Sequence, residues 1–145
     1  MYFTAAISTL FATMALAAPA PAPAETKSMM ADASWTIEGM KRTCTSDLKS
    51  CTWDFTINTH SGTPQACSGS VTGSPATQTD ITTAIKCGNF QWTAGWSNQF
   101  GPGFTTLAVV DNVNRLIAFP AYTDVQLANA TVVTPDQSYT PQALS

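Results

Sequence analysis

The side chains best suited to acid–base or nucleophilic chemistry are few in this sequence and are spread along it. His60 is the single histidine, and it lies in the polar stretch 58–62, where an exposed turn is expected. A serine–histidine–aspartate triad would have to recruit this residue. The sequence contains none of the motifs of a serine hydrolase nucleophile, a zinc protease, a phosphate-binding loop or a dinucleotide site. We therefore predict no catalytic residue and a protein that is not an enzyme.

Paired carboxylates would be another route to catalysis, because a glycosidase holds two of them across the sugar bond. No two acidic residues here are paired by their spacing. Asp111 has the sequence context of a hairpin turn, and Asp54 that of the outward face of a strand. A pair formed only in the folded chain stays open as a weak-hydrolase alternative. The candidates are Glu38, Asp54, Asp111, Asp124 and Asp136.

Three aromatic residues on one alternating run are the ligand-binding candidates. Phe90, Trp92 and Trp96 share one face of an expected strand, and amide and hydroxyl side chains lie close by in the sequence. Such rings either fill the core between two sheets or form a surface on which a glycan or a small aromatic ligand stacks. The sequence leaves both interpretations open. The second gives an alternative function, that of a secreted binding module.

The four cysteines indicate a framework of disulfides. An even number in a small exported chain predicts two bridges among Cys44, Cys51, Cys67 and Cys87, for which three connectivities exist. The turn-rich segment 45–50 joins two alternating stretches, which favours Cys44–Cys51 and thereby Cys67–Cys87. Chain entropy assigns these loops about 2.4 and about 3.3 kcal/mol. A zinc site would need Cys-x-x-Cys pairs and a histidine partner, so we predict no metal and no cofactor.

The elements that must position these residues are typical of β-strands. Apolar and polar residues alternate with a period of two, and segments rich in glycine and proline separate the runs. No segment has the long apolar stripe of a helix. We therefore predict an all-β fold, a small antiparallel β-barrel or sandwich stapled by two disulfides. The alternating runs are residues 35–38, 53–58, 67–71 and 90–96.

The second half of the chain is expected to contain a hairpin and a last strand. Phe104–Val110 and Arg115–Phe119 are two β-rich arms around the turn 111–114. A short helical turn is expected to begin at the capping pair Thr123-Asp124 and to run to about Ala128. Val125–Val133 is predicted as the last strand, centred on its final residues.

The N-terminal residues predict export. Residues 1–17 are an uncharged apolar stretch that ends in a small-x-small pattern, which indicates a signal peptide. This stretch is too short to span a bilayer, which needs roughly 20 apolar residues, and no membrane span is predicted. Residues 18–33 are a Pro/Ala-rich linker or pro-segment, and 34–145 are a single β domain with a short C-terminal tail. The protein is expected to be secreted and extracellular, with Asn129 in its one glycosylation sequon.

Charge is sparse and gives no sign of a nucleic-acid partner. Charged residues make up 10% of the chain, and six lysines and arginines stand against nine acidic residues, for a net charge of −3. Nucleic-acid binding proteins neutralise phosphates with clustered basic side chains. We therefore predict no nucleic acid among the partners.

A set of short segments carries a resemblance to known proteins. Ser34–Ile37, the spacing from Cys44 to Cys51 leading into Trp53–Ile57, and Lys86–Gly88 are its main parts. Residues 95–97, 100–107, 120–124 and 135–139 add to it. The sequence resembles the small secreted cysteine-containing proteins of filamentous ascomycete fungi, and among them it is similar to hypersensitive-response-inducing elicitors such as those of rice blast. More distantly it resembles the Alternaria major allergen β-barrel group, in which one inner cysteine pair is comparable to Cys67 and Cys87.

The resemblance implies an effector or elicitor rather than an enzyme. Such a protein would act in the host apoplast or at the fungal cell surface, by contact with a plant protein or receptor. It would induce or modulate plant defence, for example the hypersensitive response, and so contribute to virulence. The resemblance supplies no catalytic residue that can be placed on this sequence.

Overall fold

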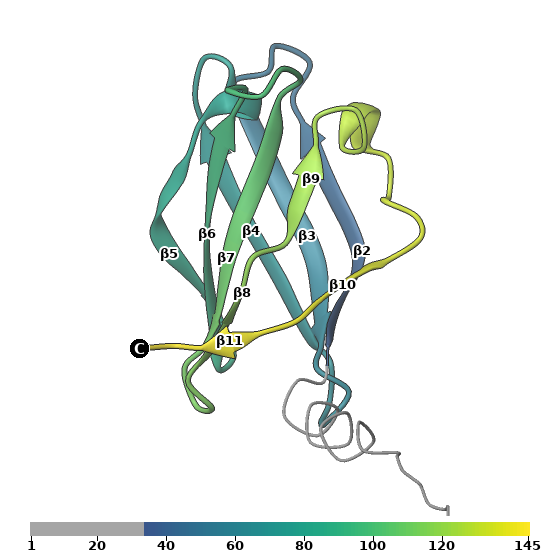
Figure 1. Ribbon diagram of the computed structural model, residues 1–145. Coiled ribbons are helices and arrows are strands. Elements are labelled where there is room, and N and C mark those ends of the chain that lie inside the picture. Colours follow the sequence, from purple (N-terminus) through teal and green to yellow (C-terminus); the bar gives the residue numbers. More distant parts are fainter. Residues whose placement is uncertain (1–33) are drawn as a thin grey trace, which may run out of the picture. The chain divides into compact units, whose positions relative to one another are not determined.

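Two antiparallel sheets lie face to face and form a β-sandwich (Figure 1). The structure is a computed structural model that describes residues 34–145; the predicted signal peptide over 1–17 and linker over 18–33 lie outside the described residues. One sheet has the strand order β10-β2-β3-β4. The other has the order β11-β8-β7-β6-β5, with β9 paired to β7. The all-β prediction is confirmed, and the sandwich is the correct one of its two alternatives.

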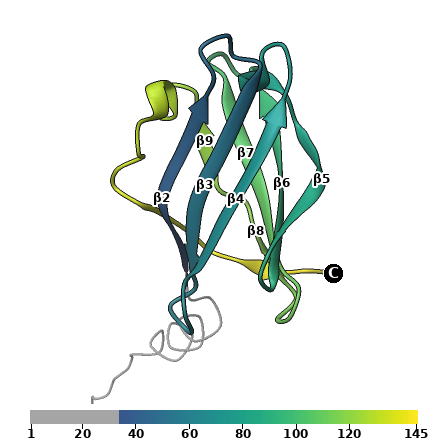
Figure 2. The ribbon, with the colours of Figure 1, turned by 180° about the vertical axis from the view of Figure 1, so that it is seen from behind.

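The strands follow the alternation of apolar residues. In β3, Cys51, Trp53, Phe55 and Ile57 are buried and the residues between them are partly exposed. Figure 2 shows β2, β3 and β4 of the first sheet side by side, seen from behind. The strands are β2 (Trp35–Cys44), β3 (Ser50–Asn58), β4 (Gln65–Thr72), β5 (Ile81–Cys87), β6 (Phe90–Ser97), β7 (Phe104–Asp111), β8 (Leu116–Ala118), β9 (Ala121–Thr123), β10 (Gln137–Tyr139) and β11 (Gln142–Ala143).

A β-bulge in β2 reverses the face that its side chains occupy. Glu38 is opposite Thr56 and Lys41 is opposite Asp54, so β2 uses one residue more than β3 over this interval. Gly39 takes a φ of +63°, a conformation that glycine adopts without the steric cost of a Cβ. The inward residues are therefore odd-numbered before the bulge and even-numbered after it.

The two long edges of the sandwich are joined in different ways. On one edge, the disulfide Cys67–Cys87 connects β4 to β5, which belong to different sheets. On the other edge, the C-terminal segment pairs with both sheets: β10 with β2, and β11 with β8. Figure 1 shows this segment running from the side of β2 to the side of β8. The second bridge, Cys44–Cys51, closes the hairpin of β2 and β3, and both predicted pairings are confirmed.

The predicted hairpin over 104–119 is present, as β7 and β8. Asp111 ends β7 and forms its turn: Oδ1 accepts hydrogen bonds from the N–H groups of Val113 (2.9 Å) and Asn114 (3.0 Å). These bonds are those of an Asx turn. The hairpin role predicted for this carboxylate is thereby confirmed.

The strand predicted at Val125–Val133 is wrong. A turn follows β9, and the 3₁₀ helix η3 (Ala128–Ala130) comes next. Asn129 and Ala130 have φ angles of +60° and +56°, which no strand accommodates. The expected helical turn at Thr123 does form, because its Oγ1 accepts a 3.1 Å bond from the Gln126 N–H. Four further strands are not predicted from the sequence, namely β5, β9, β10 and β11.

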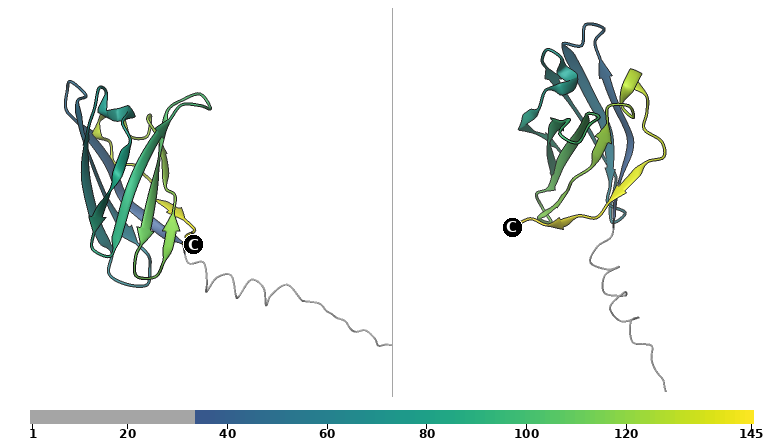
Figure 3. Two further views of the ribbon diagram at one scale, coloured as in Figure 1. Left: turned by 90° about the vertical axis from the view of Figure 1, so that its left-hand side faces the viewer. Right: turned by 45° about the horizontal axis from the view of Figure 1, so that its top comes forward.

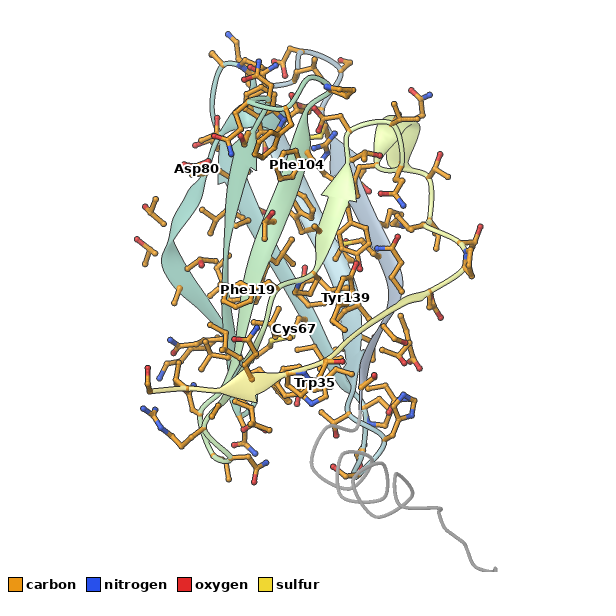
Figure 4. The ribbon with its side chains drawn as sticks, viewed as in Figure 1. Trp35, Cys67, Asp80, Phe104, Phe119 and Tyr139 are labelled. Atoms are coloured by element: carbon orange, nitrogen blue, oxygen red, sulfur yellow. A yellow bond between two sulfur atoms is a disulfide. The ribbon has the colours of Figure 1, made fainter. Side chains whose placement is uncertain are left out.

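Four connections meet at one end of the sandwich, which we call the loop end. They are residues 45–49, 73–80 with the 3₁₀ helix η2 (Ala76–Gln78), 98–103, and the segment that begins at Asp124. Hydrogen bonds join them: the Ala76 N–H donates to the Leu48 carbonyl (2.7 Å), and the Asp124 N–H to the Gly103 carbonyl (3.0 Å). Figure 3 shows these loops together, and in Figure 4 Asp80 and Phe104 lie toward this end and Trp35 toward the other.

Candidate functional site

Two of the three predicted ligand-binding aromatics lie in the core. Trp92 is 1% exposed and meets the Phe55 ring edge to face at a centroid distance of 5.2 Å. Phe90 is buried against Trp35 at 5.6 Å in the same geometry. Both rings therefore fill the space between the sheets. Trp96, on the same face of β6, lies at the loop end and is only partly buried.

A buried cation lies beneath the loop end. Arg42 is only 5% exposed, and its Nη1 donates to Asp124 Oδ1 at 3.4 Å and to the Thr77 carbonyl at 3.5 Å. Its guanidinium carbon lies 5.6 Å from the centre of the Trp53 ring, a cation–π contact. Among residues 34–145, Nε of Arg42 has no hydrogen-bond partner. This cation is therefore paired but has donors to spare.

Asp124 connects the cation to Trp96. Its Oδ2 accepts a 2.9 Å hydrogen bond from Trp96 Nε1, while Oδ1 faces Arg42. A Cβ at Gly103 would lie 2.4 Å from Asp124 Oδ2, so the loop approaches this carboxylate as closely as a glycine permits. We call Arg42, Asp124 and Trp96 the Arg42 cluster.

A pocket of about 570 Å³ opens beside the Arg42 cluster. Arg42 and Asp124 line it, and Trp96 lies behind the carboxylate. Its walls come from the β2–β3 loop, η2 and η3. They combine hydroxyl and amide groups with apolar side chains, namely Ser46, Leu48, Leu127 and Asn129. This mixture of a charged pair, neutral polar groups and apolar surface is typical of small-molecule sites.

Large apolar side chains are also exposed to solvent at the loop end. Leu48, Phe100 and Val125, one on each of three loops, are 44%, 79% and 81% exposed; we call them the loop-end apolar set. At the opposite end, Val113 in the β7–β8 turn is 64% exposed. Side chains of this kind are a common feature of protein–protein interfaces when they cluster.

The remaining catalytic candidates form no recognisable catalytic arrangement. His60 is exposed, and its Nε2 shares a 2.8 Å hydrogen bond with Thr36 Oγ1. Glu38 and Asp54 both line a shallow depression of about 320 Å³ on the first sheet. Glu38 accepts a 2.9 Å bond from Asn58 Nδ2 there. Within the part of the chain that the structure describes, no three His, Cys, Asp or Glu side chains are grouped as metal ligands.

Within the described residues, two titratable groups have shifted pKa values. The Thr45 hydroxyl, followed by the Lys49 N–H, holds the pKa of exposed Asp47 below its ordinary value. Burial in the core, with smaller contributions from Tyr139 and Asp136, raises the pKa of Tyr122. Neither group belongs to the Arg42 cluster. In residues 34–145, no helix is long and apolar enough to cross a membrane.

The structure places Asn129 in an accessible position. Its side chain is exposed at the pocket wall that η3 forms, and its backbone has a left-handed conformation. Sequence reasoning identified this residue through its sequon, whereas Arg42 was missed altogether. The available signal was the glycine at position 39, because a bulge there turns Arg42 inward.

The chain is similar to a known family of effector proteins. The profile of a protein family described as Effector TSP1 matches residues 36–144. A protein of the fungus Hypocrea virens, also described as Effector TSP1, is 44% identical over 142 residues, and the alignment covers 95% of each chain. The matched region includes both disulfides and the whole loop end.

Proposed function

The chain belongs to the Effector TSP1 family of fungal effectors, and on this premise we propose that it is secreted and acts by direct contact with a plant protein or receptor. The contact induces or modulates plant defence. The observation that carries this proposal is the loop-end apolar set: three large side chains held in water by a rigid sandwich.

The exposed apolar side chains of the loop end lie on loops that are joined to each other. Phe100 and Val125 keep roughly four fifths of their surface in water, at 79% and 81%. The loops that carry them are joined by the hydrogen bond from the Asp124 N–H to Gly103. A preorganised apolar surface loses little entropy when a partner covers it. Burial of both side chains would then supply a large share of the binding free energy.

Secretion is supported by the two bridges. All four cysteines are paired, and disulfides persist mainly in oxidising compartments such as the extracellular space. An extracellular effector meets host proteases and has no cellular chaperones. The bridge between the sheets and the paired C-terminal segment are features suited to that setting.

A non-enzymatic mechanism is part of the proposal. The carboxylates that could have catalysed hydrolysis have structural partners: Asp111 forms a turn, and Asp124 neutralises Arg42. His60 lies far along the chain from both and bonds a threonine on the surface. The structural roles of these residues therefore favour recognition of a folded surface over catalytic hydrolysis.

The test is leaf infiltration with purified protein whose disulfides are intact. The readouts are the oxidative burst and cell death, with a reduced and alkylated sample as the matched control. We expect a response that is lost when the disulfides are reduced, because the loop end then loses its fixed geometry. A response of equal size from both samples, or no response and no captured host protein in any tested plant, would contradict the proposal.

A further inference from the structure

The Arg42 pocket contains more hydrogen-bond donors than its own residues use. A guanidinium carries five N–H donors, and within residues 34–145 Arg42 uses Nη1 alone, in two long bonds of 3.4 and 3.5 Å. Buried polar groups normally have hydrogen-bond partners, and among residues 34–145 Nε of Arg42 has none. Only 5% of the Arg42 surface is exposed, yet Arg42 lines the pocket. The pocket therefore favours a ligand that brings oxygen acceptors to Arg42.

Asp124, the second charged group in the pocket, further restricts the class of ligand that the pocket can bind. Asp124 neutralises Arg42 in part and would repel a simple anion. A ligand that carries hydroxyl groups beside its own carboxylate avoids this conflict, because the hydroxyls donate to Asp124. Ser46 and Asn129 add a hydroxyl and an amide that suit further hydroxyls.

We propose that this pocket binds an acidic sugar of the uronic acid class. The carboxylate accepts hydrogen bonds from the Arg42 guanidinium, whose planar fork matches a carboxylate. Ring hydroxyls bond Asp124, Ser46 and Asn129, and Leu48 and Leu127 cover the C–H face of the ring. A volume of about 570 Å³ accommodates a ligand of this size. Leu48 belongs both to the pocket wall and to the loop-end apolar set, whereas Phe100 and Val125 do not line the pocket, so substitutions at those two residues test the protein contact separately from this site.

The test is an NMR titration of ¹⁵N-labelled protein made in bacteria, so that Asn129 carries no glycan. D-galacturonate is added, with D-galactose and acetate as matched probes that lack the carboxylate or the ring. We expect saturable shifts of the Arg42 Nε and Trp96 Nε1 signals, because Trp96 reports on Asp124. The buried Trp92 indole is expected to stay unchanged. Galactose and acetate are expected to bind at least about tenfold more weakly.

A pair of exposed variants completes the test without disturbing the core. Leu48 is 44% exposed at the pocket wall, so Leu48→Asp and Leu48→Lys remove the same apolar contact with the ring and differ from each other in charge. We expect Leu48→Lys to bind galacturonate more tightly than Leu48→Asp does, with the difference between the two variants reduced by salt. The proposal is overturned by any of three results: no shift with galacturonate, equal affinity for galactose or acetate, or identical affinity in the two variants.

Discussion

The left-handed backbone of Gly39, with a φ of +63°, directs the Arg42 side chain into the interior. Without the bulge, strict alternation from Trp35 and Ile37 would place Lys41 inward and Arg42 in solvent. The extra residue is held from outside the hairpin, since Asp136 Oδ1 accepts a 2.9 Å bond from the Gly39 N–H. A backbone feature of one strand thus creates the Arg42 cluster.

Replacement of Gly39 tests this relationship. A Cβ at Gly39 would touch nothing within 4 Å, so Gly39→Ala adds only the conformational cost of a positive φ. We expect a loss of about 1–2 kcal/mol in the free energy of unfolding, measured by urea denaturation. The control is Gly95→Ala in β6, which also meets open space but has no positive φ. It is expected to be neutral or stabilising by up to about 1 kcal/mol, and equal losses in both variants would refute the account.

The disulfide between the sheets is expected to matter more than the one in the hairpin. The two bonded cysteines are 20 residues apart in Cys67–Cys87 and 7 residues apart in Cys44–Cys51. We expect replacement of the first pair by alanine to cost about 3 kcal/mol, and of the second about 2 kcal/mol. Chemical denaturation of the two double variants measures both. The reverse order would show that the C-terminal segment alone suffices to hold the sheets together.

The hydrogen bond between Trp96 and Asp124 is expected to stabilise the folded state, because it holds the carboxylate that pairs with Arg42. Trp96→Phe removes the indole N–H and is expected to cost about 1–2 kcal/mol, because the acceptor is charged and partly buried. A double-mutant cycle with Asp124→Asn isolates this contribution from lost packing. We expect a coupling energy of about 1 kcal/mol. Additive effects of the two substitutions would mean that the bond adds nothing.

Alkaline pH is expected to destabilise the protein through Tyr122. Burial raises the pKa of Tyr122 in the folded state, whereas in the unfolded chain the phenol titrates near 10. The stabilising contribution is therefore complete below pH 10 and declines as the pH rises above it, because only the unfolded state releases the proton. Among the described residues the hydroxyl has no hydrogen-bond partner. Tyr122→Phe is thus expected to leave stability at pH 7 unchanged or to raise it by up to about 1–3 kcal/mol, and to flatten the decline at alkaline pH. A steeper decline in the variant would contradict this.

The parts of the fold that follow simple alternation could be predicted from the sequence. The β3 strand, the β7–β8 hairpin and both bridges have strong local signals: period-two burial, an Asx turn and cysteines beside a turn. Other elements depend on partners distant in the chain. The β10 and β11 strands exist because two sheet edges are free to pair with them. The residues after β9 have β-branched composition, but the Thr123–Gln126 turn and two left-handed residues override it.

The site was harder to predict than the fold. Phe90 and Trp92 showed the right spacing for a binding face, but spacing cannot tell the inner face of a strand from the outer one. The Arg42 cluster depends on one bulge and on contacts over long sequence separations, such as that of Arg42 with Asp124. Only the three-dimensional arrangement brings these groups together.

We propose that a host protein recognises the loop end of the folded sandwich. The most direct measurement compares leaf responses to wild-type protein, the double variant Phe100→Ser/Val125→Ser, and the control Val113→Ser. All three side chains are exposed, so each substitution is expected to leave the fold intact, which circular dichroism and urea unfolding verify. We predict that the double variant loses at least about tenfold in potency, since two large apolar contacts are removed, while Val113→Ser matches the wild type. Full potency in the double variant, with both folds intact, would contradict the claim.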